Sequence, residues 1–224
     1  MAHASHQEPR WRRLPEERPR QILNAALAVF GEHGLAASRL DDIAKRAGLS
    51  KGTIYLYFAN KEELFRAVVQ HTVIRKIEEG EELAASPTAS AMEMLTGFTR
   101  RYWAFVRSGE FAPIFRLVHA EILDFPDLAR FYADEVVARG HRLITSIIAR
   151  GIETGEFRDI DPAVAARMLN AQFIMHGLWC THPEYFQSVS KKSDEQVLDE
   201  MMQFYLYALR PSATGPARPR GMHS

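Results

Sequence analysis

The residues best suited to chemistry in this sequence lie in one short stretch, Lys51–Tyr57, and their types suit binding rather than turnover. If the stretch is a helix, it turns outward a basic, small, hydroxyl-bearing and aromatic set with no carboxylate. That set is Lys51, Gly52, Thr53, Tyr55, Leu56 and Tyr57. Such a face suits insertion into the major groove of DNA, where a helix reads base edges. An ordinary helical hairpin of a solvated bundle would more often expose Glu and Lys.

Two short helices joined by a tight turn, within residues 40–58, must position that face. Apolar residues recur at helical spacing in the first of them, at Leu40, Ile43, Ala44 and Ala47. Gly48 supplies the backbone freedom for a sharp helix exit, and Ser50 is the expected N-cap of the second helix. Together with a preceding helix that runs to Gly34, we expect one small core built from Ala26, Phe30, Ile43 and Ile54.

The flanking residues predict how this unit joins the rest of the chain. Ser38 is the expected N-cap of the first short helix. Asn60, with Glu63 three residues later, begins a further helix in the manner of a capping box. We expect that helix to run to about residue 79, to fray in the acidic segment 78–90, and to link the two halves of the molecule.

These motifs closely resemble a known family. The runs ILNAALAVFGEHG (22–34), DIAKRAGLSKGTIYLYF (42–58) and NKEELF (60–65) are similar, without a gap, to the N-terminal domain of tetracycline-repressor (TetR) family bacterial transcriptional regulators. The rest resembles the family only in its helical pattern and in residues 149–169. The resemblance implies an all-α fold, a three-helix DNA-binding domain with a helix-turn-helix followed by a larger helical ligand-binding and dimerisation domain. The expected boundaries are 1–15 for a disordered basic arm, 16–60, 61–209, and 210–224 for a disordered tail.

The resemblance also implies residue roles at DNA. Ser38, Lys51, Tyr57 and Lys61 would position the protein on phosphates. Gly52, Thr53 and Tyr55 would approach bases, while Leu56 would rely on methyl packing or DNA shape. The expected DNA-binding set is Ser38, Arg39, Ser50, Lys51, Gly52, Thr53, Tyr55, Leu56, Tyr57 and Lys61. The N-terminal arm, with Arg10, Arg12 and Arg13, is either solvated or crosses into the adjacent minor groove.

Composition narrows the classes of protein further. The net charge is zero, but residues 1–61 carry ten Lys and Arg against six Asp and Glu, so a basic segment precedes an acidic body. No membrane-length apolar run or secretory signal occurs, and the single cysteine, Cys180, excludes an intrachain disulfide, so we expect a cytoplasmic protein. No phosphate-binding glycine motif or HExxH occurs, so we expect no enzyme, cofactor or metal.

The second half of the chain is rich in aromatic residues at helical spacing. For each one alone, a place in a five-helix core is the simpler interpretation. As a set, and given the resemblance, they favour a cavity for an apolar or aromatic ligand with a few polar anchors. The expected ligand-binding set is Phe98, Tyr102, Trp103, Phe115, His119, Ile122, Phe173 and His176.

The last two expected helices, 163–179 and 194–209, are predicted to form a homodimer interface as a four-helix bundle. The expected interface set is Met168, Leu169, Gln172, Val197, Leu198, Met201, Met202 and Tyr205. The sequence thus predicts a regulator, by resemblance a repressor, that binds a palindromic double-stranded DNA operator as a dimer and is released by a small molecule. A regulator controlled by a protein partner is the alternative, and an enzyme is disfavoured.

Overall fold

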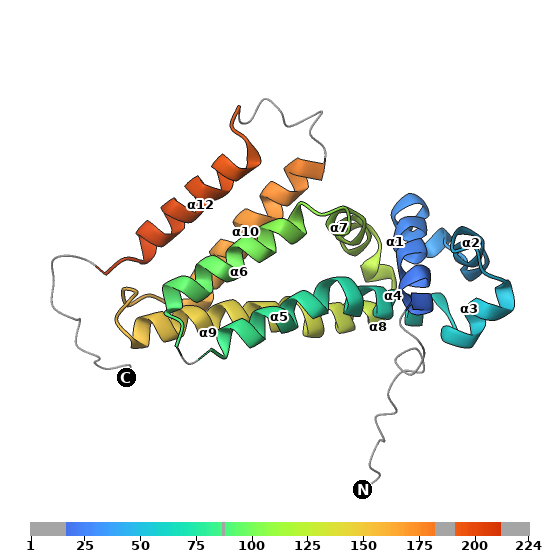
Figure 1. Cartoon of the computed structure of the whole chain (residues 1–224), viewed down its shortest axis with the longest axis horizontal. Coiled ribbons are helices and arrows are strands. Elements are labelled where there is room, and N and C mark those ends of the chain that lie inside the picture. The colour runs from blue at the N-terminus through green and yellow to red at the C-terminus, as the bar shows by residue number, and fades with distance from the viewer. Residues whose placement is uncertain (1–16, 87, 182–190, 212–224) are drawn as a thin grey trace, which may run out of the picture.

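The computed structural model describes residues 17–86, 88–181 and 191–211, and among these it contains helices and no strand, as Figure 1 shows. The predicted all-α class is therefore confirmed. The basic arm and all but the first two residues of the expected tail lie outside the described residues. Within the described part of the chain, no helix has the length and apolar character to cross a membrane.

Three helices form a compact unit at one end of the molecule (Figure 1): α1 (Glu17–Ala37), α2 (Leu40–Arg46) and α3 (Lys51–Tyr57). Their predicted core is confirmed, because Ala26, Phe30, Ile43 and Ile54 are each at most 1% exposed. Gly34 ends the regular part of α1, as expected, since its φ of 78° is a left-handed conformation that favours glycine. The α1–α3 unit therefore follows closely from the apolar spacing.

The turn between α2 and α3 has the predicted chemistry, but the start of α2 differs. Ser50 caps α3, its Oγ accepting a hydrogen bond from Thr53 N at 3.1 Å, and Gly48 has a φ of 65°. Arg39, rather than Ser38, is the N-cap of α2. The Ser38 hydroxyl instead donates to Gly34 O, because the break at Gly34 leaves that carbonyl at the end of α1 without a helical partner.

The linking helix is longer than predicted and contains a π turn. It comprises α4 (Lys61–Val69), the π turn η2 (Gln70–Ile74) and α5 (Arg75–Ala84). The expected end near residue 79 is wrong because the acidic run is paired: Arg139 donates to both carboxylate oxygens of Glu81, at 2.8 and 2.6 Å. This hydrogen bonding lowers the pKa of Glu81 and fixes α5 against the body.

The body is built from the remaining helices, α6 (Ala91–Val106), α7 (Phe111–Ala120), η3 (Ile122–Asp124), α8 (Pro126–Tyr132), η4 (Ala133–Ala138), α9 (Arg139–Glu153), α10 (Pro162–Thr181) and α12 (Asp194–Leu209). In Figure 1, α5 and α9 run along the molecule, α6 and α10 lie across them, and α12 is outermost. The 3₁₀ turn η3 follows α7 after one residue, and the π turn η4 joins α8 to α9. A π turn is a single wider turn inside an α-helix, so the spacing of apolar residues did not reveal it.

Candidate nucleic-acid interface

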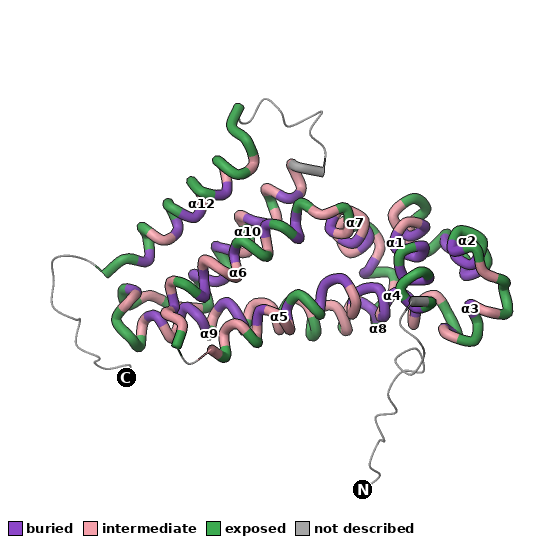
Figure 2. The backbone as a smooth tube through the Cα atoms, in the orientation of Figure 1, coloured by how far each residue is buried: buried purple, intermediate pink, exposed green. Residues whose placement is uncertain are grey.

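The outward face of α3 is open to solvent, as Figure 2 shows for this end of the molecule. Tyr55 and Leu56 are 46% and 58% exposed, while Ile54 between the core helices is fully buried. A Cβ at Gly52 would meet only Ser50 Oγ, at 3.9 Å. The packing of the protein therefore does not require glycine at position 52, and a requirement for glycine there would come from whatever approaches α3.

Lys51 is held on this face by an acid from α2. Its Nζ donates to Asp41 Oδ2 at 2.8 Å and lies 5.8 Å from the centre of the Tyr55 ring. The hydrogen bond to Asp41 raises the pKa of Lys51 above its ordinary value. Asp41, in the first turn of α2, thus orients the first cation of α3.

The other predicted DNA-binding residues differ in how far they reach solvent. Thr53 is half-buried and shares a hydrogen bond of 2.8 Å with the Ser50 hydroxyl, while Tyr57 is half-buried beside Phe58. Arg39 is exposed. Ser38 is only 4% exposed, so its hydroxyl is turned into the protein in this conformation.

Lys61 lies where the α1–α3 unit meets the linking helix. Its Nζ donates to Ala36 O at 2.7 Å and lies 5.8 Å from the centre of the Phe125 ring of the body. The neighbouring amide of Ala36 donates to Glu121 Oε2 at 3.0 Å. One residue at the end of α1 is therefore held by a side chain from each half of the molecule.

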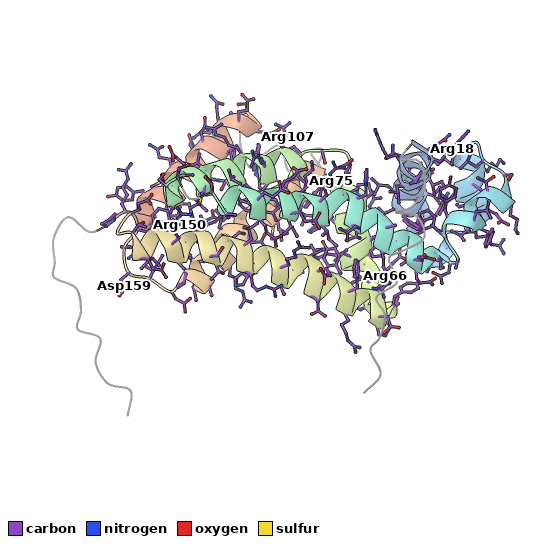
Figure 3. The ribbon with its side chains drawn as sticks, turned by 60° about the horizontal axis from the view of Figure 1, so that its bottom comes forward. Arg18, Arg66, Arg75, Arg107, Arg150 and Asp159 are labelled. Atoms are coloured by element: carbon purple, nitrogen blue, oxygen red, sulfur yellow. The ribbon has the colours of Figure 1, made fainter. Side chains whose placement is uncertain are left out.

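Further contacts cross the same junction. Gly31 of α1 packs against Pro113 of α7 so closely that a Cβ at Gly31 would lie 3.0 Å from the proline Cβ. Arg66 of α4, labelled in Figure 3, donates to Asp127 O at 3.1 Å and lies 4.8 Å from the centre of the Phe131 ring. A cavity of about 540 Å³ lies between α1 and α7 beside these contacts. The α1–α3 unit is thus attached to the body through α7, and the linking helix is attached to it through α8.

In the body, five of the eight predicted ligand-binding residues form one continuous group of rings, from α6 and α10. Phe98 lies 5.8 Å from Tyr102, which stacks on Phe173 at 5.3 Å between ring centres. Trp103 meets Phe173 edge-on at 5.7 Å and stacks on His176 at 4.6 Å. We call these five residues the inner ring cluster.

The other three predicted residues lie on other elements, α7 and η3. Phe115 stacks on His119 at 3.9 Å on α7, and Ile122 is buried in η3. His119 is exposed, with its Nδ1 hydrogen-bonded to Phe115 O at 2.9 Å. Neither the cavity beside α1 nor a second one of about 450 Å³ between α5 and α9 is lined by any of the eight residues.

Within the described ranges of the body, several side-chain polar atoms are buried without a hydrogen-bond partner. They are Trp103 Nε1, Gln172 Oε1, His176 Nε2 and, on α9, Thr145 Oγ1. The neighbouring Tyr102 hydroxyl is satisfied, since it donates to Asn170 Oδ1 at 2.7 Å. Sequence spacing marks such residues as inward-facing, but it carries no sign that their polar atoms lack partners.

Four of the eight predicted interface residues are buried within the protomer. Leu169, Leu198, Met202 and Tyr205 are buried, and the Tyr205 hydroxyl donates to Ala165 O at 2.7 Å. Met168 is 58% exposed. The outer faces of α10 and α12 instead carry large apolar residues that the prediction did not include: Val164, Met175, Phe204 and Tyr207.

Comparison with known proteins identifies the two halves separately. Residues 22–68 match the model of bacterial regulatory proteins of the tetR family, and residues 93–210 match the AefR-like transcriptional repressor C-terminal domain. No cluster of residues suited to a metal ion occurs in the part of the chain that the structure describes.

Individual relatives agree with these matches. The fatty acid metabolism regulator protein of Bacillus subtilis is 28% identical over 159 residues, which are 70% of this chain and 80% of the relative. The transcriptional repressor KstR2 of Mycobacterium tuberculosis is 29% identical over 158 residues, 66% of this chain and 74% of the relative.

The fold is also that of a solved member. The Bacillus subtilis regulator FadR, in complex with stearoyl-CoA, superposes with a TM-score of 0.67 at 24% identity, over 85% of this chain and 99% of that one. The two family models together match both the helix-turn-helix end and the body. The relatives are transcriptional regulators rather than enzymes. The chain therefore belongs to the tetR family of bacterial transcriptional regulators.

Proposed function

We propose that this protein is a repressor that binds a palindromic operator as a homodimer and is released by an apolar or aromatic small molecule. The observation that carries the DNA-binding part is the α3 face. Its core side is fixed by the buried Ile54, and its outer side carries exposed Lys51, Gly52, Tyr55 and Leu56 with no carboxylate of its own.

The proposed contacts with DNA are of two kinds, to phosphates and to base edges. Lys51 and Lys61 carry the charges placed for phosphates, and Arg39 is exposed at the start of α2. Gly52 and Tyr55 are placed to approach base edges, because a helix without a side chain at position 52 can lie deeper in the groove. Lys51 would exchange its bond to Asp41 for a phosphate contact, and Ser38 would contribute only if its hydroxyl turned outward.

The dimer part of the proposal rests on the outer faces of α10 and α12. Val164, Met168 and Met175 fall on one face of α10 at a spacing of four and seven residues, and each is about half exposed. Phe204 and Tyr207, 70% and 73% exposed, lie three residues apart on α12. Exposed large apolar residues on two neighbouring helices are typical of a subunit interface. Two α3 helices one turn of DNA apart, about 34–36 Å, would then read the half-sites.

The effector part rests on the inner ring cluster and its unpartnered polar atoms. A ligand site is commonly lined by apolar and aromatic side chains with a few polar groups. The relatives named above include a regulator of fatty acid metabolism and a structure with stearoyl-CoA bound. Those relatives support an effector with a large apolar part.

Control by a protein partner is the second candidate, and a specific observation favours it. The rings of the inner cluster contact each other, and the two cavities described above lie elsewhere. If these rings fill the core and leave no room for a ligand, regulation would depend on a partner that binds the protein surface. Leu123, 82% exposed beside the domain junction, is the apolar residue best placed for such a partner.

One experiment tests the function. Duplexes bound by the protein are selected from a random pool, and the selected sequence is titrated by fluorescence anisotropy at two salt concentrations against scrambled DNA. We expect a palindrome bound at least about a thousandfold more tightly than scrambled DNA. Binding that depends on salt and is indifferent to sequence would contradict operator recognition.

A further inference from the structure

The polar atoms enclosed around the inner ring cluster form a pattern that bears on effector chemistry. Trp103 is 5% exposed, and its Nε1–H, which can only donate, has no acceptor among the residues that the structure describes. His176, whose ring lies 4.6 Å from the Trp103 ring, has an enclosed and unpartnered Nε2. Gln172, one turn earlier on α10, has an unpartnered Oε1, which can only accept.

An unmet donor beside an unmet acceptor calls for a particular kind of group. A hydroxyl can accept from Trp103 Nε1–H and donate to Gln172 Oε1 or His176 Nε2 at the same time. A carbonyl could only accept the hydrogen bond from Trp103 Nε1–H, and a hydrocarbon could form no hydrogen bond with either group. Buried groups left unmet are costly, so a molecule that satisfies both gains selectivity over one that satisfies none.

The rings packed around these atoms are uncharged. The rings of Phe98, Tyr102 and Phe173 supply apolar surface, and the one polar tip among them, the Tyr102 hydroxyl, is bonded to Asn170. Burial raises the pKa of Tyr102 well above its ordinary value, so that hydroxyl stays neutral.

Charges near His176 are few and balanced. Arg107 and Asp194 act on it in opposite directions, and they are paired with each other at 2.7 Å. Burial lowers the pKa of His176, so its ring is neutral at neutral pH. A carboxylate or an ammonium entering here would lose its hydration without gaining a charged partner, which is costly.

We infer that the inner ring cluster recognises an uncharged effector bearing a hydroxyl group on an apolar or aromatic body, with Trp103, Gln172 and His176 as the residues that read the hydroxyl. This inference rests on the proposed effector function of the same cluster, and it names the class of molecule. Binding requires the rings to separate, because they contact one another in the structure.

A matched set of probes tests the inference at neutral pH. The set is para-heptylphenol, heptylbenzene, para-heptylbenzoate and para-heptylbenzylamine, which share an apolar body and differ in the polar group. Their dissociation constants are measured on the full chain by equilibrium dialysis. We expect para-heptylphenol to bind at least about tenfold more tightly than each of the others.

Two variants separate the hydroxyl contact from general packing. Trp103→Phe keeps a ring and removes the N–H, so it should weaken para-heptylphenol about tenfold and leave heptylbenzene nearly unchanged. Trp179→Phe removes the same group one turn beyond His176, outside the cluster, and should leave the ranking of the four probes as it is in the unaltered protein.

The result that would overturn the inference is a benzoate or amine bound as tightly as the phenol, or an equal loss of phenol and heptylbenzene in Trp103→Phe. Failure of all four probes to bind would overturn it as well. Operator titration of the same preparation, without probes, reports the proposed DNA-binding function independently. A protein that binds its operator but ranks the probes differently would refute only the effector class.

Discussion

The α1–α3 unit and the body treat their buried polar groups differently. In the α1–α3 unit, side chains donate hydrogen bonds to carbonyls near helix ends. Gln21 donates to Ala47 O at 2.7 Å, and Ser38 donates to Gly34 O. In the body, the atoms without partners include those of Trp103 and His176. An unmet buried group costs about 1–3 kcal/mol, so a bound molecule can recover free energy from the body.

This difference suggests which end of the molecule rearranges when an effector binds and which end moves as a unit. Among the described residues of the α1–α3 unit, no buried side-chain nitrogen or oxygen lacks a hydrogen-bond partner, so we expect the unit to move as a rigid body. The body contains the unmet polar groups and the π turn η4, and the linking helix contains the π turn η2. Turns of this kind commonly mark functional positions in helices. The contacts of Glu121 and Arg66 across the junction would carry a change in the body to α1 and α4.

The largest expected effect comes from breaking the core of the α1–α3 unit. Ile54→Ala removes a fully buried side chain, so we expect the free energy of unfolding to fall by about 3 kcal/mol and operator binding to be lost. Urea unfolding followed by circular dichroism measures the change. Leu56→Ala, at a 58% exposed neighbour, is the control and should change stability by less than about 0.5 kcal/mol.

If the α1–α3 unit folds independently of the body, Ile54→Ala will split the unfolding curve into two transitions. A single transition, shifted as a whole, would mean that the junction at Gly31 and Pro113 binds both ends into one cooperative unit. That outcome would refute independent folding of the α1–α3 unit.

The next effect is on DNA alone. Tyr55→Ala removes a half-exposed ring from the outer face of α3, so we expect operator affinity to fall at least about tenfold with no loss of thermal stability. Anisotropy titration and a thermal melt of the same sample report the two quantities. A lowered melting temperature with unchanged binding would show that Tyr55 supports the fold rather than the contact.

The sequence was sufficient to predict the α1–α3 unit, because each choice there is local. Apolar spacing placed Ile43 and Ile54 in the core, the glycine at position 48 marked the turn, and Ser50 marked the cap. Ser38 was the exception. Its position before α2 resembles that of a cap, but the break at Gly34 offers its hydroxyl a nearer acceptor.

The body was predictable in its helices but not in its site, because pairings between distant helices leave no local signal. Whether Phe115 joins Phe173 or lies apart on α7 depends on how helices cross. The end of α5 was misjudged for the same reason, since the partner of Glu81 lies 58 residues away at Arg139. The α1–α3 unit is therefore specified by local sequence signals, whereas the site in the body depends on contacts between residues far apart in the sequence.

A smaller effect is expected where the body closes on itself. Glu156 accepts hydrogen bonds from Ala91 N and Met92 N, both at 3.0 Å, at the start of α6. These bonds lower the pKa of Glu156, so the carboxylate stabilises the fold above the ordinary glutamate pKa, near 4.3. That stability is lost as the pH falls through the lowered folded-state value.

Glu156→Gln should therefore lower the free energy of unfolding by about 1 kcal/mol at neutral pH and by less near pH 3, because the contribution of the carboxylate falls as the pH approaches the lowered folded-state pKa. Urea unfolding at a series of pH values measures this dependence. Glu153→Gln, at an exposed carboxylate near the end of α9, is the control and should not alter the pH dependence. Equal effects of Glu156→Gln at both pH values would show that packing, rather than charge, is what the carboxylate supplies.

The smallest expected effect tests the junction itself. Lys61→Ala removes a charge placed for phosphate, so the slope of log affinity against log salt should fall by about one, and affinity should fall alike for operator and scrambled DNA. Lys76→Ala removes the same charge from the linking helix where Lys76 lies 3.7 Å from Glu79, and should leave the slope unchanged. An unchanged slope in Lys61→Ala would mean that its bond to Ala36 O persists on DNA. Lys61 would then belong to the mechanical link between the two ends rather than to the DNA-binding surface.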